Sequence, residues 1–310
     1  MSKHVLVIGS INVDYVIHTE RLPKLGETLT GSDFAMNFGG KGANQAVALS
    51  KAGCEVKMLG AVGNDLLGEL ALKNLADCGV DVSAVLRVDA PTGAAVITVC
   101  GGDNHIVLDV GANAYVTPEV IDNASVLIEW ADTVVMQYEI PVESVLLAAR
   151  LAHVMGKRVV INPAPVKPID EALYKHVDLL VPNEFEVEMI TGIKQENNDD
   201  ARRAVRALKA LGCSDAIVTL GERGSAYSMG DEVAFHGVYK VTRVDTTAAG
   251  DSFIGGICAK LCEGRTLDEA VDYATAVSAI TVSRAGASVS IPTEDEVKAF
   301  LLKHCGSDQT

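Results

Sequence analysis

The sequence predicts an α/β protein with a doubly wound, mainly parallel sheet, helices on both faces and a small antiparallel β lid. Three observations indicate this fold class. Short runs of β-branched residues alternate with longer segments of helical periodicity, which is the pattern of a parallel sheet covered on both faces. The 310 residues are 48% hydrophobic and 22% charged, which supplies the side chains of a large core. Two extended segments interrupt the alternation, and we assign them to the lid.

The strands and helices are expected in alternating order along a single domain, residues 1–310. The strands are expected at Val5–Ile8, Val56–Ala61, Thr133–Gln137, Arg158–Asn162, Leu179–Pro182 and Ala216–Leu220. The helices are expected at Lys41–Ala52, Leu67–Asp77, Ser144–Met155 and Asp199–Leu211, with a buried helix at Ser252–Ala259. Ligands of such sheets bind beyond the carboxyl ends of the strands. Polar residues that follow strands are therefore candidates for a binding site.

The expected lid comprises residues 13–36 and 92–110. Its second part contains two extended runs, Thr92–Cys100 and His105–Asp109, joined by the turn sequence Gly101-Gly102-Asp103-Asn104. A flap over the strand ends would exclude water from a site there, whereas a plain surface hairpin is the alternative. Isolated ribbons are marginally stable, so we expect a homodimer formed through the apolar lid strands. The apolar residues in question are Val96, Ile97, Val107 and Leu108.

Charge and cysteine content narrow the classes of partner. The net charge of -15 repels nucleic acid and anionic membranes, and no run of Lys or Arg reverses it locally, so we expect neither partner. The 7 cysteines show no C-x-x-C spacing and follow no export signal, which predicts reduced thiols and a cytoplasmic protein. The apolar run Val5–Ile8 is far too short to span a membrane.

The most informative segment is Asp245-Thr246-Thr247-Ala248-Ala249-Gly250-Asp251, directly before the expected buried helix. Its small residues leave backbone N–H groups open, and a helix start adds unpaired donors and the positive end of the dipole. A carboxylate repels a bound anion, so Asp251 indicates proton abstraction beside a phosphate rather than phosphate holding. An ordinary helix N-cap is the alternative, because Asp and Gly are favoured there.

A second informative segment is Phe38-Gly39-Gly40-Lys41-Gly42-Ala43-Asn44-Gln45-Ala46. Glycines at the start of a helix allow a ligand to approach the backbone, while Lys41 and Asn44 offer donors. The segment lacks the spacing of a Walker A loop and of a Rossmann fingerprint. Because no G-x-G-x-x-G follows Val5–Ile8, a nicotinamide dehydrogenase is excluded. A turn with a solvated lysine remains the alternative.

The two segments together resemble the two signature segments of the PfkB carbohydrate kinase family, in the same order. Further ordered matches cover nearly the whole chain. They are Gly9-Ser10-Ile11-Asn12-Val13-Asp14, Asn162-Pro163-Ala164-Pro165, Pro182-Asn183-Glu184-x-Glu186 and Thr219-Leu220-Gly221-x-x-Gly224. The resemblance implies an ATP-dependent transfer of phosphate to the 5-hydroxyl of D-ribose. Another acceptor (2-deoxyribose, a ketohexose or a nucleoside) and a sugar sensor without catalysis are the alternatives.

The resemblance also implies roles for individual residues. The sugar pocket is expected to be lined by Asn12, Asp14, Gly40, Lys41, Asn44 and Glu139. Asp251 resembles the catalytic base that takes the proton of the attacking hydroxyl. The backbone N–H groups of Ala248, Ala249 and Gly250 would hold the developing negative charge.

Cofactor residues follow from the same resemblance. Asn183 and Glu186 match a motif that acts on Mg²⁺ and the phosphates, often through water; read alone, they form the capped start of a helix. Thr219, Gly221 and Gly224, with Gly250, would lie beside ATP, and Thr275 beside the adenine. A monovalent cation, K⁺, would lie near Asp245, Thr247, Thr281, Arg284, Gly286 and Ser290.

Overall fold

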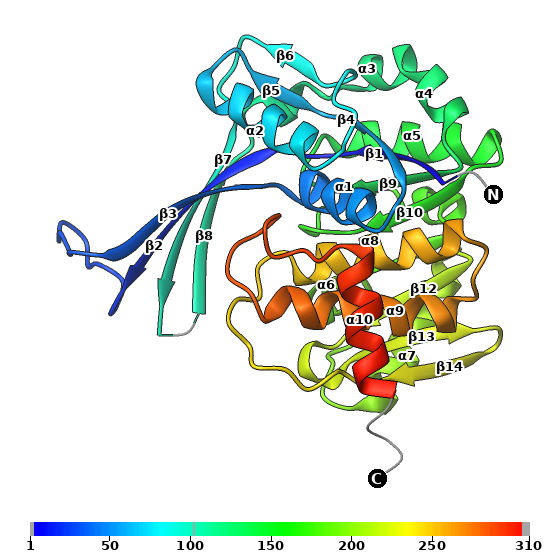
Figure 1. The fold of residues 1–310 in the computed structure, drawn as a ribbon. Coiled ribbons are helices and arrows are strands. Elements are labelled where there is room, and N and C mark those ends of the chain that lie inside the picture. Colours follow the sequence, from blue (N-terminus) through cyan, green and yellow to red (C-terminus); the bar gives the residue numbers. More distant parts are fainter. Residues whose placement is uncertain (1–2, 102, 306–310) are drawn as a thin grey trace.

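The computed structural model describes residues 3–101 and 103–305 and contains a mainly parallel central sheet (Figure 1). Within these residues its eight strands lie in the order β4 (Glu55–Leu59), β1 (His4–Ile8), β9 (Thr133–Gln137), β10 (Arg158–Asn162), β11 (Leu179–Leu180), β12 (Asp215–Thr219), β13 (Ser225–Met229) and β14 (Glu232–His236). The pairs from β4 to β12 are parallel. The pairs β12–β13 and β13–β14 are antiparallel. The predicted fold class is confirmed.

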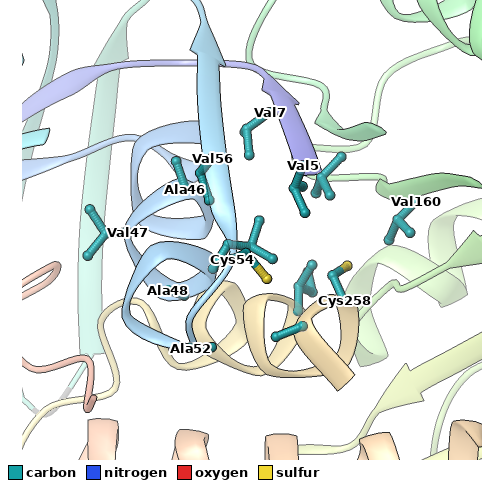
Figure 2. Close-up of a cluster of buried hydrophobic side chains, with 14 of the residues drawn as sticks. Val5, Val7, Ala46, Val47, Ala48, Ala52, Cys54, Val56, Val160 and Cys258 are labelled. Carbon is teal, nitrogen blue, oxygen red and sulfur yellow. The ribbon is translucent and has the colours of Figure 1, made fainter. Parts of the chain in front are cut away.

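Helices cover both faces of this sheet because alternate strand residues point to opposite sides. Val5 and Val7 of β1 belong to one buried core, which Figure 2 shows between the sheet and helices α1 (Lys41–Lys51) and α8 (Ala249–Cys262). Leu6 and Ile8 belong to the core on the other face. The first layer also contains α2 (Leu66–Asp77) and α9 (Leu267–Val282), on which α10 (Glu294–Cys305) packs.

The second layer contains the helices that follow the lid region. They are α3 (Pro118–Asn123), α4 (Ser125–Trp130), α5 (Val142–Val154), α6 (Glu184–Thr191) and α7 (Asn198–Leu211). Short 3-10 helices lie at Gly111–Tyr115, Glu171–His176 and Gly221–Arg223. No helix within the described ranges is both long enough and apolar enough to cross a membrane.

A second sheet extends from one side of the body (left in Figure 1). Its four strands in the described part of the chain have the order β3 (Ser32–Gly39), β2 (Asn12–Thr19), β7 (Gly93–Cys100) and β8 (Asp103–Asp109). Two antiparallel hairpins, β2–β3 and β7–β8, are joined through a parallel pair, β2–β7. Because β8 begins at Asp103, the turn is shorter than predicted; position 102 of that turn lies outside the described residues.

Two strand predictions need correction. The run Val56–Ala61 is interrupted at Gly60: β4 ends at Leu59, and β5 (Ala61–Gly63) pairs instead with β6 (Leu86–Val88) in a small separate sheet. The hairpin β13–β14 was not predicted at all. Its turn, Gly230-Asp231, is a two-residue hairpin signal that the sequence carries.

Candidate active site

A cavity of about 200 Å³ opens at the carboxyl ends of the parallel strands. Asn162 and Thr219 are the last residues of β10 and β12, and Val181 directly follows β11. The opposite wall is the start of α8. The remaining lining residues are Lys41, Asn183, Glu186, Thr246, Ala248, Ala249, Gly250, Asp251 and Ile254. The cavity therefore contains residues predicted for the base, the phosphates and the metal.

Close helix packing positions Asp251, which lies in the first turn of α8 and is 7% exposed. A Cβ atom on Gly255 would lie 2.4 Å from Cβ of Ala48 on α1, so this glycine allows the two helices to approach. As a result, α1 reaches both carboxylate oxygens. Asn44 Nδ2 donates to Oδ2 at 3.0 Å, and Gln45 Nε2 donates to Oδ1 at 3.0 Å.

The start of α8 has the geometry of an anion-binding helix end. Ala248, its N-cap residue, has a left-handed backbone with φ 60°, a strained conformation that is common at functional sites. The N–H of Ala249 donates to the carbonyl of Thr246 at 3.2 Å. Helix geometry leaves the N–H groups of the following first-turn residues, Gly250 and Asp251, without intrahelical acceptors. Of the three N–H groups expected to hold charge, that of Ala249 is thus already engaged.

The start of α1 packs tightly against the turn between β1 and β2. Gly40 has φ 89°, and a Cβ atom there would lie 2.8 Å from the backbone nitrogen of Asn12. This approach brings the Lys41 backbone to Glu139, whose Oε2 accepts from Lys41 N at 3.2 Å, Asn12 Nδ2 at 3.4 Å and Ser10 Oγ at 2.5 Å. Two residues predicted for the sugar pocket, Asn12 and Lys41, therefore meet at the carboxylate of a third, Glu139.

Asp14 lies next to this cluster on β2 and is 8% exposed. Burial, and secondarily the carboxylates of Glu139 and Asp251, raise the pKa of Asp14 to about 7. Burial acts to lower the pKa of the Lys41 amine, but the neighbouring carboxylates, that of Asp251 first, outweigh it and hold the pKa above its ordinary value. The pocket thus keeps a charged lysine among several acids.

Asn183 and Glu186 form a capping box at the start of α6. Asn183 Oδ1 accepts from the backbone N–H of Glu186 at 2.8 Å, and Glu186 Oε2 accepts from the backbone N–H of Asn183 at 2.8 Å. Burial raises the pKa of Glu186. The hydrogen bond from the Asn183 backbone and the charge of Lys41 act to lower this pKa but do not cancel the effect of burial. The helix-cap interpretation of this motif is confirmed, and both residues also line the cavity.

Residues predicted for the nucleotide are less closely gathered. Thr219 lines the cavity, whereas Thr275 lies on α9 outside its lining and donates its hydroxyl proton to the carbonyl of Val271 at 2.8 Å. Gly221 begins a 3-10 turn and Gly224 directly follows it, with φ 56° and 86° respectively. A Cβ atom on Gly224 would lie 1.9 Å from the carbonyl oxygen of His236, so this glycine is required by the turn itself.

The residues predicted near a monovalent cation divide into two groups. The Asp245 carboxylate accepts from the Thr247 hydroxyl at 2.7 Å and from the Gly286 N–H at 3.0 Å, so these three lie together. The other three side chains are engaged elsewhere. Thr281 donates to the carbonyl of Val277 at 2.9 Å, Ser290 donates to that of Ala287 at 2.7 Å, and Arg284 pairs with Glu296 at 2.6 Å.

Sequence reasoning missed several polar residues that support the site. Ser10 holds Glu139, and Asn113 Nδ2 donates to Asn12 Oδ1 at 2.7 Å. Gln45 and Gln137 are both 0% exposed and hydrogen bonded to each other. The available signal was an amide within an otherwise apolar buried segment, as at the end of Thr133–Gln137.

The whole chain is similar to known sugar kinases. A model of the pfkB family carbohydrate kinases matches residues 2–294. The chain belongs to this family. As a pfkB family member it is a carbohydrate kinase, and its fold is the one seen in ribokinase structures.

Three similar proteins illustrate the range of the family. A ribokinase of Haemophilus influenzae is 37% identical over 303 residues, covering 97% of this chain and 99% of that protein. A deoxyribokinase of Salmonella typhi is 34% identical over 300 residues, with 96% and 98% covered. The structure of Arabidopsis thaliana ribokinase complexed with ribose and ATP has a TM-score of 0.91 at 33% identity, covering 97% of this chain and 99% of that one.

Proposed function

We propose that this carbohydrate kinase transfers the γ-phosphoryl group of ATP to the 5-hydroxyl of D-ribose and yields D-ribose 5-phosphate. The observation that carries the proposal is the placement of Asp251. Its carboxylate is fixed by two amides of α1 at the N-terminus of α8, beside the cluster around Glu139. Ribokinases that this chain matches over 99% of their length support ribose as the acceptor.

The sugar would be held by the acids and amides of the pocket, because they both accept from and donate to hydroxyl groups. Asp251 accepts the proton of the sugar 5-hydroxyl while the oxygen of that hydroxyl forms a bond to the γ-phosphorus. The bond from the γ-phosphorus to the bridging oxygen breaks, and ADP leaves with the electron pair. The N–H groups of Ala248 and Gly250 and the amine of Lys41 stabilise the developing charge, and the N–H of Ala249 joins them only on leaving the carbonyl of Thr246.

Asn183 and Glu186 fit Mg²⁺ held through water. Their oxygens already accept backbone N–H groups of the capping box, which suits contacts to a hydrated ion better than direct ligation. When bound, Mg²⁺ supplies positive charge against the β- and γ-phosphates. We place ATP beside Thr219, Gly221, Gly224 and Gly250, with its adenine towards Thr275.

We also propose a K⁺ site at the two loops that Asp245 joins. Because the side chains of Thr281, Arg284 and Ser290 are engaged within the scaffold, the ligands would be mainly backbone carbonyls beside Asp245, Thr247 and Gly286. The thiols of Cys54, Cys78, Cys100, Cys213, Cys258 and Cys262 are free, in accord with the cytoplasmic location that we propose.

The second sheet is proposed as a lid over the sugar pocket and as a dimer contact. Strand β2 carries Asn12 and Asp14, so the sheet begins at the pocket. Across the four strands, Met36, Tyr15, Val96 and Val107 lie directly opposite one another. Val96 and Val107 are 52% and 73% exposed, which supports a partner on that face.

The acceptor is tested by rates on D-ribose, 2-deoxyribose, a ketohexose and a nucleoside, each with and without K⁺. We expect the highest kcat/KM on D-ribose and a gain on adding K⁺. The deoxyribokinase relative makes 2-deoxyribose the competing acceptor, and a better rate on that sugar would replace the ribose assignment. Equal rates with K⁺ and with a large organic cation would remove the K⁺ site.

The catalytic role is tested with Asp251→Asn. We expect sugar and ATP binding to persist in calorimetry while kcat falls by roughly two to four orders of magnitude, the usual contribution of a general base. Asp295→Asn, which removes a carboxylate with a 95% exposed side chain, is the matched control and keeps its activity. Near-normal turnover of Asp251→Asn would show that another group takes the proton.

A further inference from the structure

We propose that Gln45 is a positioning residue for the base Asp251, and that Gln137 in turn orients Gln45. The inference rests on the proposed function, because it concerns the same carboxylate. Gln45 does not line the cavity, and its side chain is completely buried between α1, β9 and α8. Gln45 can therefore influence the reaction only through its hydrogen bond to Asp251.

The direction of each hydrogen bond is fixed by chemistry. An ionised carboxylate only accepts, so Gln45 must turn its NH₂ group towards Asp251 Oδ1, 3.0 Å away. The Gln45 Oε1 then faces away and accepts from Gln137 Nε2 at 2.6 Å. Flipping either amide would place two oxygens, or an amide oxygen and a carboxylate, in contact. The two glutamines thus act as one oriented unit.

The position of Gln137 is itself tightly restricted. Gln137 ends the buried strand β9, and a Cβ atom on Gly9 would lie 2.0 Å from its Oε1. That oxygen has no hydrogen-bond partner among the described protein groups. Leaving a buried acceptor unpaired is costly, yet this orientation is the one that lets Gln137 donate to Gln45. Gln137 therefore holds Gln45 in place with its Nε2, while its own Oε1 is left without a hydrogen-bond donor.

The second carboxylate oxygen completes the clamp. Asn44 Nδ2 donates to Asp251 Oδ2 at 3.0 Å, so the carboxylate is held at both ends and cannot rotate about its last bond. Gln45 Nε2 also lies 3.5 Å from Asn162 Oδ1, which anchors the same amide to the end of β10. Asn44 is expected to contact the sugar as well, so a substitution of Asn44 would affect both sugar binding and the position of Asp251. A substitution of Gln45 tests the position of Asp251 alone.

The experiment is a double-mutant cycle between Gln45→Met and Asp251→Asn. Met keeps the length and burial of Gln45 but donates no hydrogen bond. We expect Gln45→Met to lower kcat by about 10- to 100-fold, the usual effect of a misplaced reacting group, while KM for both substrates stays unchanged. In the Asp251→Asn background, the same change should cause no further loss, because there is no base left to position.

Gln137→Met extends the test should Gln45→Met fold poorly, and should show a smaller loss of kcat with the same dependence on Asp251. Thr133→Val, at the other end of β9, is the control for a buried polar group without this role; its hydroxyl lies 3.5 Å from the sulfur of Cys262. Stoichiometry of sugar binding by calorimetry corrects each rate for the folded fraction.

The outcomes separate cleanly. Equal loss from Gln45→Met with and without Asp251 would mean a purely structural role and would overturn the inference. A rise in KM without a fall in kcat would make Gln45 a binding residue and overturn it too. Near-normal turnover of Asp251→Asn alone would instead remove the proposed base, whatever the glutamines do.

Discussion

Asp14 shows how the pocket stores an electrostatic cost in a single residue. Its pKa is raised from 3.8 to about 7, mainly by burial. Below the lower value both the folded and the unfolded protein carry the proton on Asp14. As the pH rises, the unfolded chain loses that proton first, so the free energy of unfolding falls until the folded pKa is passed. Asp14 therefore destabilises the empty enzyme at neutral and alkaline pH.

Asp14→Asn is expected to raise the free energy of unfolding by up to about 4 kcal/mol at about pH 8, with the gain vanishing near pH 4. The same change should weaken sugar binding, because an ionisable acceptor is lost. Urea unfolding across this pH range and calorimetry with D-ribose measure the two effects. A stability gain that does not change with pH would contradict the assigned cause, and Asp295→Asn provides the exposed comparison.

At this scale the sequence predicted the residues that belong to motifs and missed those that only support them. The structure brings Asn44 to Asp251 across 207 positions of chain, and both had been identified from their segments. Gln45 stands in the same segment but looks like an ordinary helix residue, because its partners Gln137 and Asp251 come from distant elements. Only the packed fold shows that these amides face one another.

The N-termini of two helices, α6 and α8, meet at the cavity. Each provides the positive end of a helix dipole towards the expected phosphates. At α6 the capping box performs two functions with the same residues, since Asn183 and Glu186 both cap the helix and line the cavity. A second capping box, Thr266 with Glu269, starts α9 on the exterior.

Asn183→Ala and Thr266→Ala should each lower the free energy of unfolding by about 1 kcal/mol, because each removes an N-cap side chain. Only Asn183→Ala should also impair turnover, with a weaker response to Mg²⁺. Chemical denaturation and Mg²⁺ titrations of the rate distinguish the two effects. Equal activity of the two variants would leave Asn183 with a capping role alone.

Most elements of the central sheet were predictable because buried parallel strands are continuous apolar runs. The failures have local causes. Gly60 redirects the chain between β4 and β5, and the run Val56–Ala61 gives no sign of this because both of its parts are buried. The hairpin β13–β14 ends the parallel order. Its strands are as long as β12, but polar residues interrupt their apolar residues, which hides them beside the continuous apolar runs.

At the scale of the molecule, the second sheet has two different faces, an inner one that carries Asp14 and an outer one. Asp14 lies opposite Asn37 and Ala95, whereas the neighbouring residues Tyr15, Met36 and Val96 share the other face. Of the four lid residues predicted to pair between subunits, Val96 and Val107 lie on this outer face. Ile97, on the Asp14 side, is 9% exposed and is packed within the protein.

Val107→Lys should therefore convert the proposed dimer to a monomer, because burying an unpaired charge in an apolar contact is costly. Light scattering at micromolar concentration measures the mass. Val126→Lys changes a residue of similar exposure, 71% against 73%, on α4 and should leave the mass unaltered. A monomeric mass for the unmodified protein would rule out the dimer altogether.

The root of the second sheet has a consequence for how such an enzyme can change. Asn12 and Asp14, which we expect to select the sugar, are also the first residues of β2, and Gly39 and Gly93 press against their side chains. A substitution of Asn12 or Asp14 that changes the acceptor therefore also changes how the second sheet is attached to the body of the protein. We expect a successful redesign to substitute Asp14 together with residues at its contact with Gly39, and Asn12 together with residues at its contact with Gly93. Acceptor preference and the arrangement of the two subunits of the proposed dimer would then change together.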